Sequence, residues 1–234
     1  MKPVLIISHA TCEAPGYLRE FLDRQAVVYR IVDHDDNALD VDLIEEVAGL
    51  VFLGSPVSVN DDLSWIDEEI KFIQLALDRE IPVLGLCFGA QLMARALGAE
   101  VCSASSMQIG WHQLALSEHA RRVFQSSDLP PSFFAFEWHG DTFSTPVGAL
   151  PLFTAACIEN QGFAYKNCLA LQFHPEITES MVYEWLDRYQ HCLLAPNKCI
   201  QSREEILMHL QERLAAQRLV ADDLFGWWLD QLKV

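Results

Sequence analysis

The sequence predicts an α/β fold: a doubly wound, mostly parallel sheet with helices on both faces, an added antiparallel portion and a helical C-terminal extension. Over residues 1–98, short apolar runs alternate with segments of helical period, as in parallel strands joined by crossover helices. Shorter alternating runs follow over residues 100–173, and the chain from residue 178 onward has helical period. A chain of 234 residues with 51% apolar composition can form a single sizeable core.

The first half of the chain supplies the parallel sheet. Strands are expected over residues 4–8, 27–32, 49–54 and 82–86, with helices over residues 17–22, 63–79 and 90–97. The helix over 63–79 is the clearest, because its apolar residues share one stripe and its first turns are acidic. Cys87 falls between the last strand and the last helix, at the edge where open α/β sheets bind ligands.

The second half is expected to add short strands and then helices. The strands are predicted over residues 111–116, 133–136, 152–157 and 168–173, and some of them are antiparallel. Ser202 and Glu205 fit a capping box that begins a helix over residues 206–219. We therefore predict one domain over residues 1–195 and a helical extension over residues 196–234 packed on the same domain.

The C-terminal stretch L-F-G-W-W-L-D-Q-L is rich in large apolar side chains. We expect this helix to cover the core, with Trp227 and Trp228 at least partly buried. The alternative is a docking face for a partner or for a second copy of the chain, since exposed aromatic patches are costly unless they are used.

Charge and cysteine content exclude several classes of protein. The formal charge of −17, with no basic cluster, disfavours nucleic acid and anionic membrane surfaces as partners. No apolar run approaches the ~18 residues of a membrane span. Seven cysteines without a C-x-x-C pair favour reduced thiols and a cytoplasmic protein. Most of these thiols are expected to be small buried hydrophobes, namely Cys102, Cys157, Cys168 and Cys192.

Residues 85–91 read G-L-C-F-G-A-Q, a cysteine between two near-neighbouring glycines. A nucleophile on a sharp strand-to-helix turn projects its reactive atom into a cleft, and flanking glycines permit the tight backbone. A free thiol has a pKa of ~8.5, and lowering it by two units requires about 2.7 kcal/mol. A helix N-terminus typically supplies ~0.3–1 kcal/mol, so a histidine must supply the rest. Without such a partner, Cys87 would be interpreted as a buried hydrophobe.

That histidine is found in A-L-Q-F-H-P-E, residues 170–176. Side chains alternate in direction along extended backbone, so His174 and Glu176 point to the same side. The carboxylate of Glu176 can fix the tautomer of the His174 imidazole and favour its protonated form. A separate elbow cysteine and a carboxylate-paired histidine together indicate nucleophilic catalysis.

The two motifs, in this order, resemble the signatures of the class I (triad-type) glutamine amidotransferases, over roughly residues 45–180. The resemblance implies a flavodoxin-like fold with an added antiparallel part. It also implies that Cys87 is the nucleophile, His174 the base and acid, and Glu176 the group that orients the histidine. We expect no metal ion or cofactor, and no G-x-x-x-x-G-K-[ST] phosphate loop is present.

The resemblance also implies an oxyanion hole and a substrate site. The family's oxyanion donors are the backbone N–H after the nucleophile, here Phe88, and one from a Gly-Gly-Pro turn after the third strand. This chain has Gly54-Ser55-Pro56 at that turn, and Ser55 can serve because the donor is main chain. The residues implied to bind the substrate are Gly54, Gln91, His139, Gly140 and Asp141.

One of these substrate-binding assignments, that of Gln91, also has a local argument. Gln91 lies about one helical turn after Cys87 and therefore on the same face of the helix. The stretch F-E-W-H-G-D-T-F, residues 136–143, is expected to be a loop. The resemblance implies that its backbone near His139, Gly140 and Asp141 lies over the α-amino and α-carboxylate groups of glutamine. No carboxylate partner is implied for His139, so His174 is the preferred catalytic histidine.

The implied reaction is hydrolysis of the L-glutamine side-chain amide through a γ-glutamyl thioester, with ammonia passing to a separate synthase chain. One alternative is a hydrolase of γ-glutamyl peptides or amines that uses the same triad. Another is a non-catalytic regulatory subunit with the same fold. A serine-type α/β-hydrolase is disfavoured, because its acid precedes its histidine in the chain.

Overall fold

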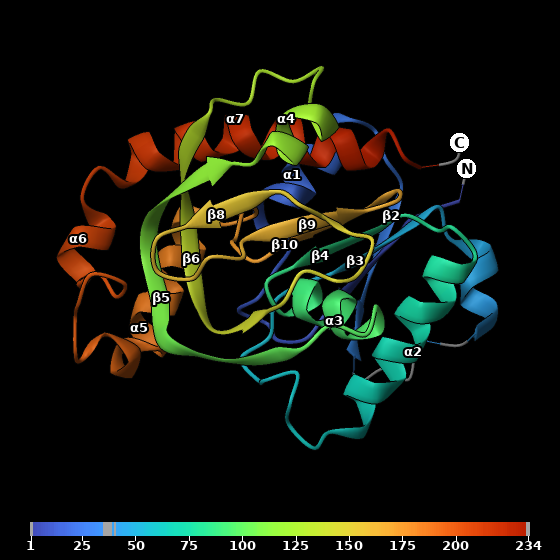
Figure 1. The fold of residues 1–234 in the computed structure, drawn as a ribbon, viewed down its shortest axis with the longest axis horizontal. Coiled ribbons are helices and arrows are strands. Elements are labelled where there is room, and N and C mark those ends of the chain that lie inside the picture. The colour runs from blue at the N-terminus through green and yellow to red at the C-terminus, as the bar shows by residue number, and fades with distance from the viewer. Residues whose placement is uncertain (1, 35–38, 40, 233–234) are drawn as a thin grey trace.

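The computed structural model describes residues 2–34, 39 and 41–232, and a seven-stranded sheet forms its centre (Figure 1). The strand order is β2-β1-β3-β4-β10-β9-β7, and the pairings from β2 to β10 are parallel. The strands are β1 (Val4–Ser8), β2 (Tyr29–Asp33), β3 (Gly49–Phe52), β4 (Val83–Leu86), β7 (Leu150–Pro151), β9 (Gly162–Tyr165) and β10 (Cys168–Leu171). The predicted mostly parallel sheet is thus confirmed.

Helices cover both faces of this sheet, as the alternation of side chains along the strands requires. Val4 and Ile6 of β1 pack with the apolar residues of α1 (Gly16–Arg24). Leu5 and Ile7 point to the other face, where α2 (Ser64–Asp78) and α3 (Phe88–Ala96) lie. A 3-10 helix, Val41–Glu46, precedes β3.

A second, antiparallel sheet has the order β6-β5-β8 and lies beside the main sheet (Figure 1). Its strands are β5 (Val101–Leu116), β6 (Ser132–Phe143) and β8 (Phe153–Ala155). The prediction that residues 136–143 form a loop is wrong, because they continue β6 and pair with β5. Phe136-Glu137-Trp138-His139 alternates apolar and polar residues as a strand does, but residues 135–139 are all buried, so the polar residues do not mark a solvent-facing side.

The remaining helices are α4 (Glu118–Val123), α5 (Glu179–Arg188), a 3-10 helix (Gln190–Leu193), α6 (Arg203–Leu207) and α7 (Leu210–Leu229). In the view of Figure 1, α7 lies above the strands. The capping box of Ser202 and Glu205 is confirmed. The single helix predicted over 206–219 is wrong, because the chain breaks at His209, whose φ of 57° is left-handed.

The C-terminal helix α7 is core cover, as predicted. Trp228 is fully buried and Trp227 is partly buried against the same apolar cluster. Its buried Gln217 also reaches the neighbouring elements, since it accepts a hydrogen bond from the Phe136 N–H (2.7 Å) and donates one to the His174 carbonyl (2.8 Å). No helix among the described residues has the length and apolarity to cross a membrane.

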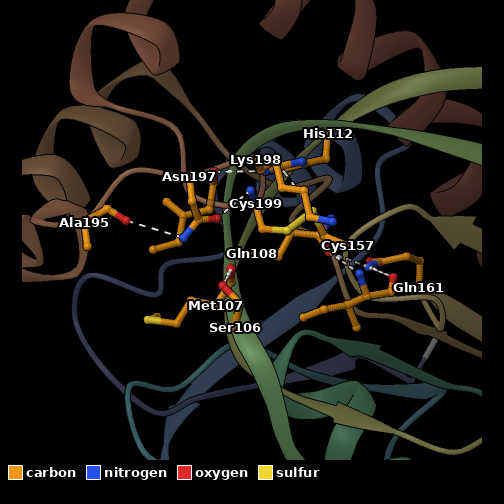
Figure 2. Close-up of a disulfide and its surroundings, with 12 residues drawn as sticks. Ser106, Met107, Gln108, His112, Cys157, Gln161, Ala195, Asn197, Lys198 and Cys199 are labelled. Atoms are coloured by element: carbon orange, nitrogen blue, oxygen red, sulfur yellow. Dashed lines mark hydrogen bonds between the residues drawn. A yellow bond between two sulfur atoms is a disulfide. The ribbon is translucent and has the colours of Figure 1, made fainter.

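Three of the four cysteine predictions are wrong. Cys157 forms a disulfide with Cys199, whose Cα lies 5.7 Å away, so these two thiols are not free (Figure 2). Cys102 is exposed and Cys192 is half-buried, whereas Cys168 is buried as predicted. The disulfide was not predictable from spacing, because its two cysteines lie 42 residues apart and the fold brings them together.

Candidate active site

Cys87 lies on a strained turn between β4 and α3. Its φ of 51° and ψ of −103° are unusual for a residue with a side chain, and its N–H donates to the Leu171 carbonyl (2.8 Å) of the neighbouring strand β10. A Cβ atom added at Gly85 would lie 2.5 Å from the Gly89 carbonyl oxygen. One added at Gly89 would lie 2.1 Å from the Phe52 carbonyl oxygen. Both glycines flanking the cysteine are therefore required by close backbone contact.

His174 lies near Cys87 because β10 and β4 are adjacent parallel strands. Its Nδ1 is 2.7 Å from Glu176 Oε1, and both side chains are buried. The indole of Trp185 meets the imidazole edge to face, with 4.7 Å between ring centroids. Nε2 of His174 makes no hydrogen bond of standard geometry to a described residue. The sequence-predicted cysteine, histidine and glutamate are thus brought together.

The thiol and the imidazole affect each other's protonation. Burial raises the pKa of the Cys87 thiol above its ordinary value, and the nearby His174 opposes this shift. Burial works against a charged His174, but Glu176 and Cys87 prevail and raise the pKa of His174 well above its ordinary value. The expectation of a lowered pKa for Cys87 is therefore wrong for the ligand-free site. The cause is the burial of the Cys87 sulfur, which the motif alone does not reveal.

Glu13 is a carboxylate of the site that the sequence analysis missed. It follows β1, is 7% exposed, and lines the same cavity as Cys87. Burial raises the pKa of Glu13 from 4.5 to about 7; His174 lowers it and Glu176 raises it further. A large fraction of Glu13 is consequently protonated at neutral pH. Its one sequence signal was its position just after the first strand.

The turn after β3 has two free backbone donors nearby. A Cβ at Gly54 would lie 2.4 Å from Glu13 Oε2, so glycine fits there closely. Ser55 is not among the described residues with positive φ, so its side chain causes no backbone strain. The N–H groups of Ser55 and Phe88 donate no hydrogen bond to any described residue.

A cavity of about 330 Å³ opens above Cys87 and collects most of the predicted substrate-binding residues. Gln91 donates through Nε2 to the Asp141 carbonyl (3.3 Å) and to Gln172 Oε1 (3.3 Å). Nε2 of Gln172 lies 3.7 Å from the Cys87 sulfur. Gln172 is a second residue of the site that the sequence analysis missed. The residues that line the cavity are Glu13, Ser55, Pro56, Val57, Ser58, Cys87, Phe88, Gln91, Met107, Trp138, His139, Gly140, Asp141, Tyr189, His191 and Cys192.

His139 has a carboxylate partner after all. Its Nε2 is 3.1 Å from Glu137 Oε2, and its Nδ1 is 2.9 Å from the Asp141 carbonyl. Both ring nitrogens are therefore engaged within β6. The reason given for preferring His174 is thus wrong, but a different reason replaces it: His174 has one ring nitrogen without such a partner among the described residues. The side chain of Asp141 is itself held by Ser58 and Ser103.

The fold and the site together define a class of protein. A cysteine on a strained strand-to-helix turn, beside a histidine bonded to a carboxylate and under free backbone N–H groups, is equipped for attack on an amide or ester carbonyl. The site lies at the carboxyl ends of β1, β3, β4 and β10, the ligand-binding edge of an open α/β sheet. This is the site of a cysteine-nucleophile hydrolase or transferase.

The comparisons with known proteins identify the family. The model described as "Glutamine amidotransferase class-I" matches residues 17–183. A "GMP synthase [glutamine-hydrolyzing]" of Borreliella burgdorferi (strain N40) is 32% identical over 137 residues, which cover 57% of this chain and 25% of that protein. One from Neisseria meningitidis (strain FAM18) is 32% identical over 165 residues, 67% of this chain and 30% of that protein. The chain thus spans less than a third of these relatives.

Two solved structures cover nearly the whole chain. A glutamine amido transferase from Methylobacillus flagellatus has a TM-score of 0.93 and 30% identity, covering 100% of this chain and 96% of that one. A glutamine amidotransferase from Thermotoga maritima has a TM-score of 0.83 and 28% identity, covering 97% and 98%. The chain belongs to the class-I glutamine amidotransferases, a family of enzymes with a cysteine nucleophile.

Proposed function

We propose that the chain hydrolyses the side-chain amide of L-glutamine with Cys87, His174 and Glu176. The observation that carries this proposal is that the elbow cysteine, which lines the cavity, lies beside a buried histidine. Nδ1 of that histidine, His174, is 2.7 Å from Oε1 of Glu176. Glu176 holds Nδ1 of the imidazole, so that Nε2 is the nitrogen available to the thiol.

The reaction has two stages. The Cys87 sulfur attacks the amide carbon with its proton held by His174, whose raised pKa favours the imidazolium, and the developing oxyanion accepts hydrogen bonds from the N–H groups of Ser55 and Phe88. The protonated His174 then gives its proton to the departing nitrogen, which leaves as ammonia and leaves a γ-glutamyl thioester. Water, deprotonated by His174, attacks this thioester and releases glutamate, and the proton stays on His174.

The cavity wall supports a role in binding the amino-acid end of the substrate. Gln91, His139, Gly140 and Asp141 line the cavity, and the side chains of Gln91 and His139 are both held by hydrogen bonds to the Asp141 carbonyl. Fixed polar groups lower the ordering cost of binding. Because the curated relatives carry the name GMP synthase, we also propose that the ammonia passes to a synthase on a separate chain.

We propose a cytoplasmic location because the seven cysteines of the sequence include no C-x-x-C pair. The Cys157–Cys199 disulfide is the observation that weighs against it, since disulfides are rare in cytosolic proteins.

The test is release of glutamate and ammonia from glutamine by the purified chain, compared with Cys87→Ala and with Cys102→Ala. Cys102 is exposed on β5 and makes a matched control for the loss of a thiol. We expect Cys87→Ala to abolish turnover and Cys102→Ala to retain it. Full activity of Cys87→Ala would refute the assignment. Release of glutamate from γ-glutamyl peptides or amines, but not from glutamine, would favour a γ-glutamyl hydrolase.

A further inference from the structure

A buried histidine lies behind the turn that supplies one oxyanion donor. His9 directly follows β1, and its Nδ1 lies 3.1 Å from the Gly54 carbonyl oxygen. Its Nε2 lies 3.0 Å from Oε2 of Glu69, which comes from α2. The side chains of His9 and Glu69 are 0% and 2% exposed. Neither residue lines the cavity, and neither was singled out by its sequence pattern.

The acceptor fixes the direction of the hydrogen bond at Nδ1. The Gly54 carbonyl can only accept, so Nδ1 of His9 must carry a hydrogen. Nε2 faces Oε2 of Glu69, and this contact holds the ring in the orientation that presents Nδ1–H to the Gly54 carbonyl.

This carbonyl belongs to the same peptide group as the Ser55 N–H. The described residues contain no cis peptide bond, and in a trans peptide the C=O and N–H point in opposite directions. His9 holds the carbonyl on the side away from the cavity, so the N–H of Ser55 is directed toward the cavity that Ser55 and Cys87 line. The hydrogen bond also polarises the peptide, which makes this N–H a stronger donor.

The ring of His9 is itself firmly held. Its centroid is 5.6 Å from that of Trp65 in a stacked arrangement and 5.0 Å from that of Phe88 edge to face. The ring of His34 is also near, with 5.9 Å between its centroid and that of His9. His9 thus contacts both parts of the oxyanion site: the carbonyl of the Gly54–Ser55 peptide and the side chain of the residue whose N–H is the second donor.

We propose that His9 and Glu69 are positioning residues that orient the Gly54–Ser55 peptide so that its N–H stabilises the oxyanion. The proposal rests on the proposed function, because the donor matters only if a carbonyl is attacked. Neither Glu69 nor His9 lines the cavity that contains the nucleophile. Their contribution is the preorganisation of a donor, which lowers the barrier to reaction without adding to substrate affinity.

The test uses two substitutions that preserve different halves of the imidazole. In His9→Asn the side-chain amide can occupy the place of Nδ1 and donate to the Gly54 carbonyl. In His9→Gln the amide reaches the place of Nε2 and meets Glu69 instead. We expect His9→Gln to lower kcat about 10- to 100-fold with KM changed less than about twofold, below the roughly 10²–10³ of losing a donor outright. His9→Asn should lose no more than about threefold.

Alkylation of Cys87 by iodoacetamide separates positioning from general damage, because sulfur displaces iodide from a saturated carbon and no oxyanion forms. We expect the alkylation rate of Cys87 to be similar in His9→Asn and His9→Gln. The melting temperatures of the two variants should also be similar. Equal losses of kcat in both variants, or wild-type kcat in His9→Gln, would overturn the proposal. If His9→Gln does not fold, Glu69→Gln and Glu69→Leu give the same comparison: the amide can donate to Nε2 of a neutral His9, while leucine cannot, so kcat should fall only in Glu69→Leu.

The proposed function can fail independently. If the wild-type chain releases glutamate from neither glutamine nor γ-glutamyl compounds, that function is refuted. The positioning proposal is then judged from a crystal structure of His9→Gln, in which the Gly54 carbonyl should have turned from its wild-type direction. A Gly54–Ser55 peptide that keeps its orientation in the variant would overturn it.

Discussion

Replacing Glu13 with Gln tests whether burial holds a carboxyl group of the site near neutral pKa. Burial raises the pKa of Glu13 from 4.5 to about 7. An acid whose pKa is higher in the folded than in the unfolded state destabilises the fold as pH rises through that interval, because the unfolded chain ionises first. Below the lower pKa both states are protonated and the group contributes nothing. Above the higher pKa both are ionised and the penalty is complete.

The magnitude follows from the size of the shift. The full penalty amounts to about 3 kcal/mol, of which about 1 kcal/mol is present near pH 5 and nearly all near pH 8.5. Glu13→Gln removes this titration, so the free energy of unfolding of the variant relative to wild type should rise by about 2–3 kcal/mol between these two pH values. Any constant effect of the new amide cancels in that difference.

The measurement is urea unfolding of both proteins across this pH range. Glu68→Gln is the matched control, because Glu68 is an exposed carboxylate on α2. Its free-energy difference from wild type should stay within about 0.5 kcal/mol at every pH. A difference for Glu13→Gln that is equally independent of pH would refute the argument from burial.

Three further changes test other parts of the structure. Glu176→Gln removes the negative charge beside His174 and should lower kcat for glutamine hydrolysis by about 10²- to 10⁴-fold, whereas unchanged kcat would show that the pair is not needed. Gly89→Ala places a methyl group 2.1 Å from the Phe52 carbonyl, and it should cost about 1–3 kcal/mol of unfolding free energy in urea. Cys199→Ser opens the loop of 42 residues closed by the disulfide and should cost up to about 4 kcal/mol; wild type, but not this variant, should lose stability on reduction.

The parallel sheet was predictable because each of its strands is a short apolar run at the expected spacing. The positions of Cys87 and His174 followed from that order, since both residues end strands that prove to be neighbours. The prediction failed where the local pattern was ambiguous. In β6 the buried residues occupy both faces, and at His209 a left-handed residue breaks what is otherwise a continuous helical period.

Four residues escaped prediction from the sequence for a common physical reason. Glu13, Glu69, Glu137 and Gln172 are polar side chains, and each became important only through burial or through a partner distant in the sequence. Burial of a particular polar group cannot be predicted from composition, because such residues are mostly exposed. The rise in the pKa of Cys87 was missed for the same reason.

The contacts of Gln217 connect the last long helix to the chemistry. One amide group bridges the backbone of β6 and the backbone of His174. Fraying of α7 back to this residue would release the histidine from one of its supports, so shortening the carboxyl terminus should impair turnover before it unfolds the sheet. An expression tag or fusion partner that disturbs α7 therefore acts on the reaction centre, although it is attached far along the chain from the nucleophile.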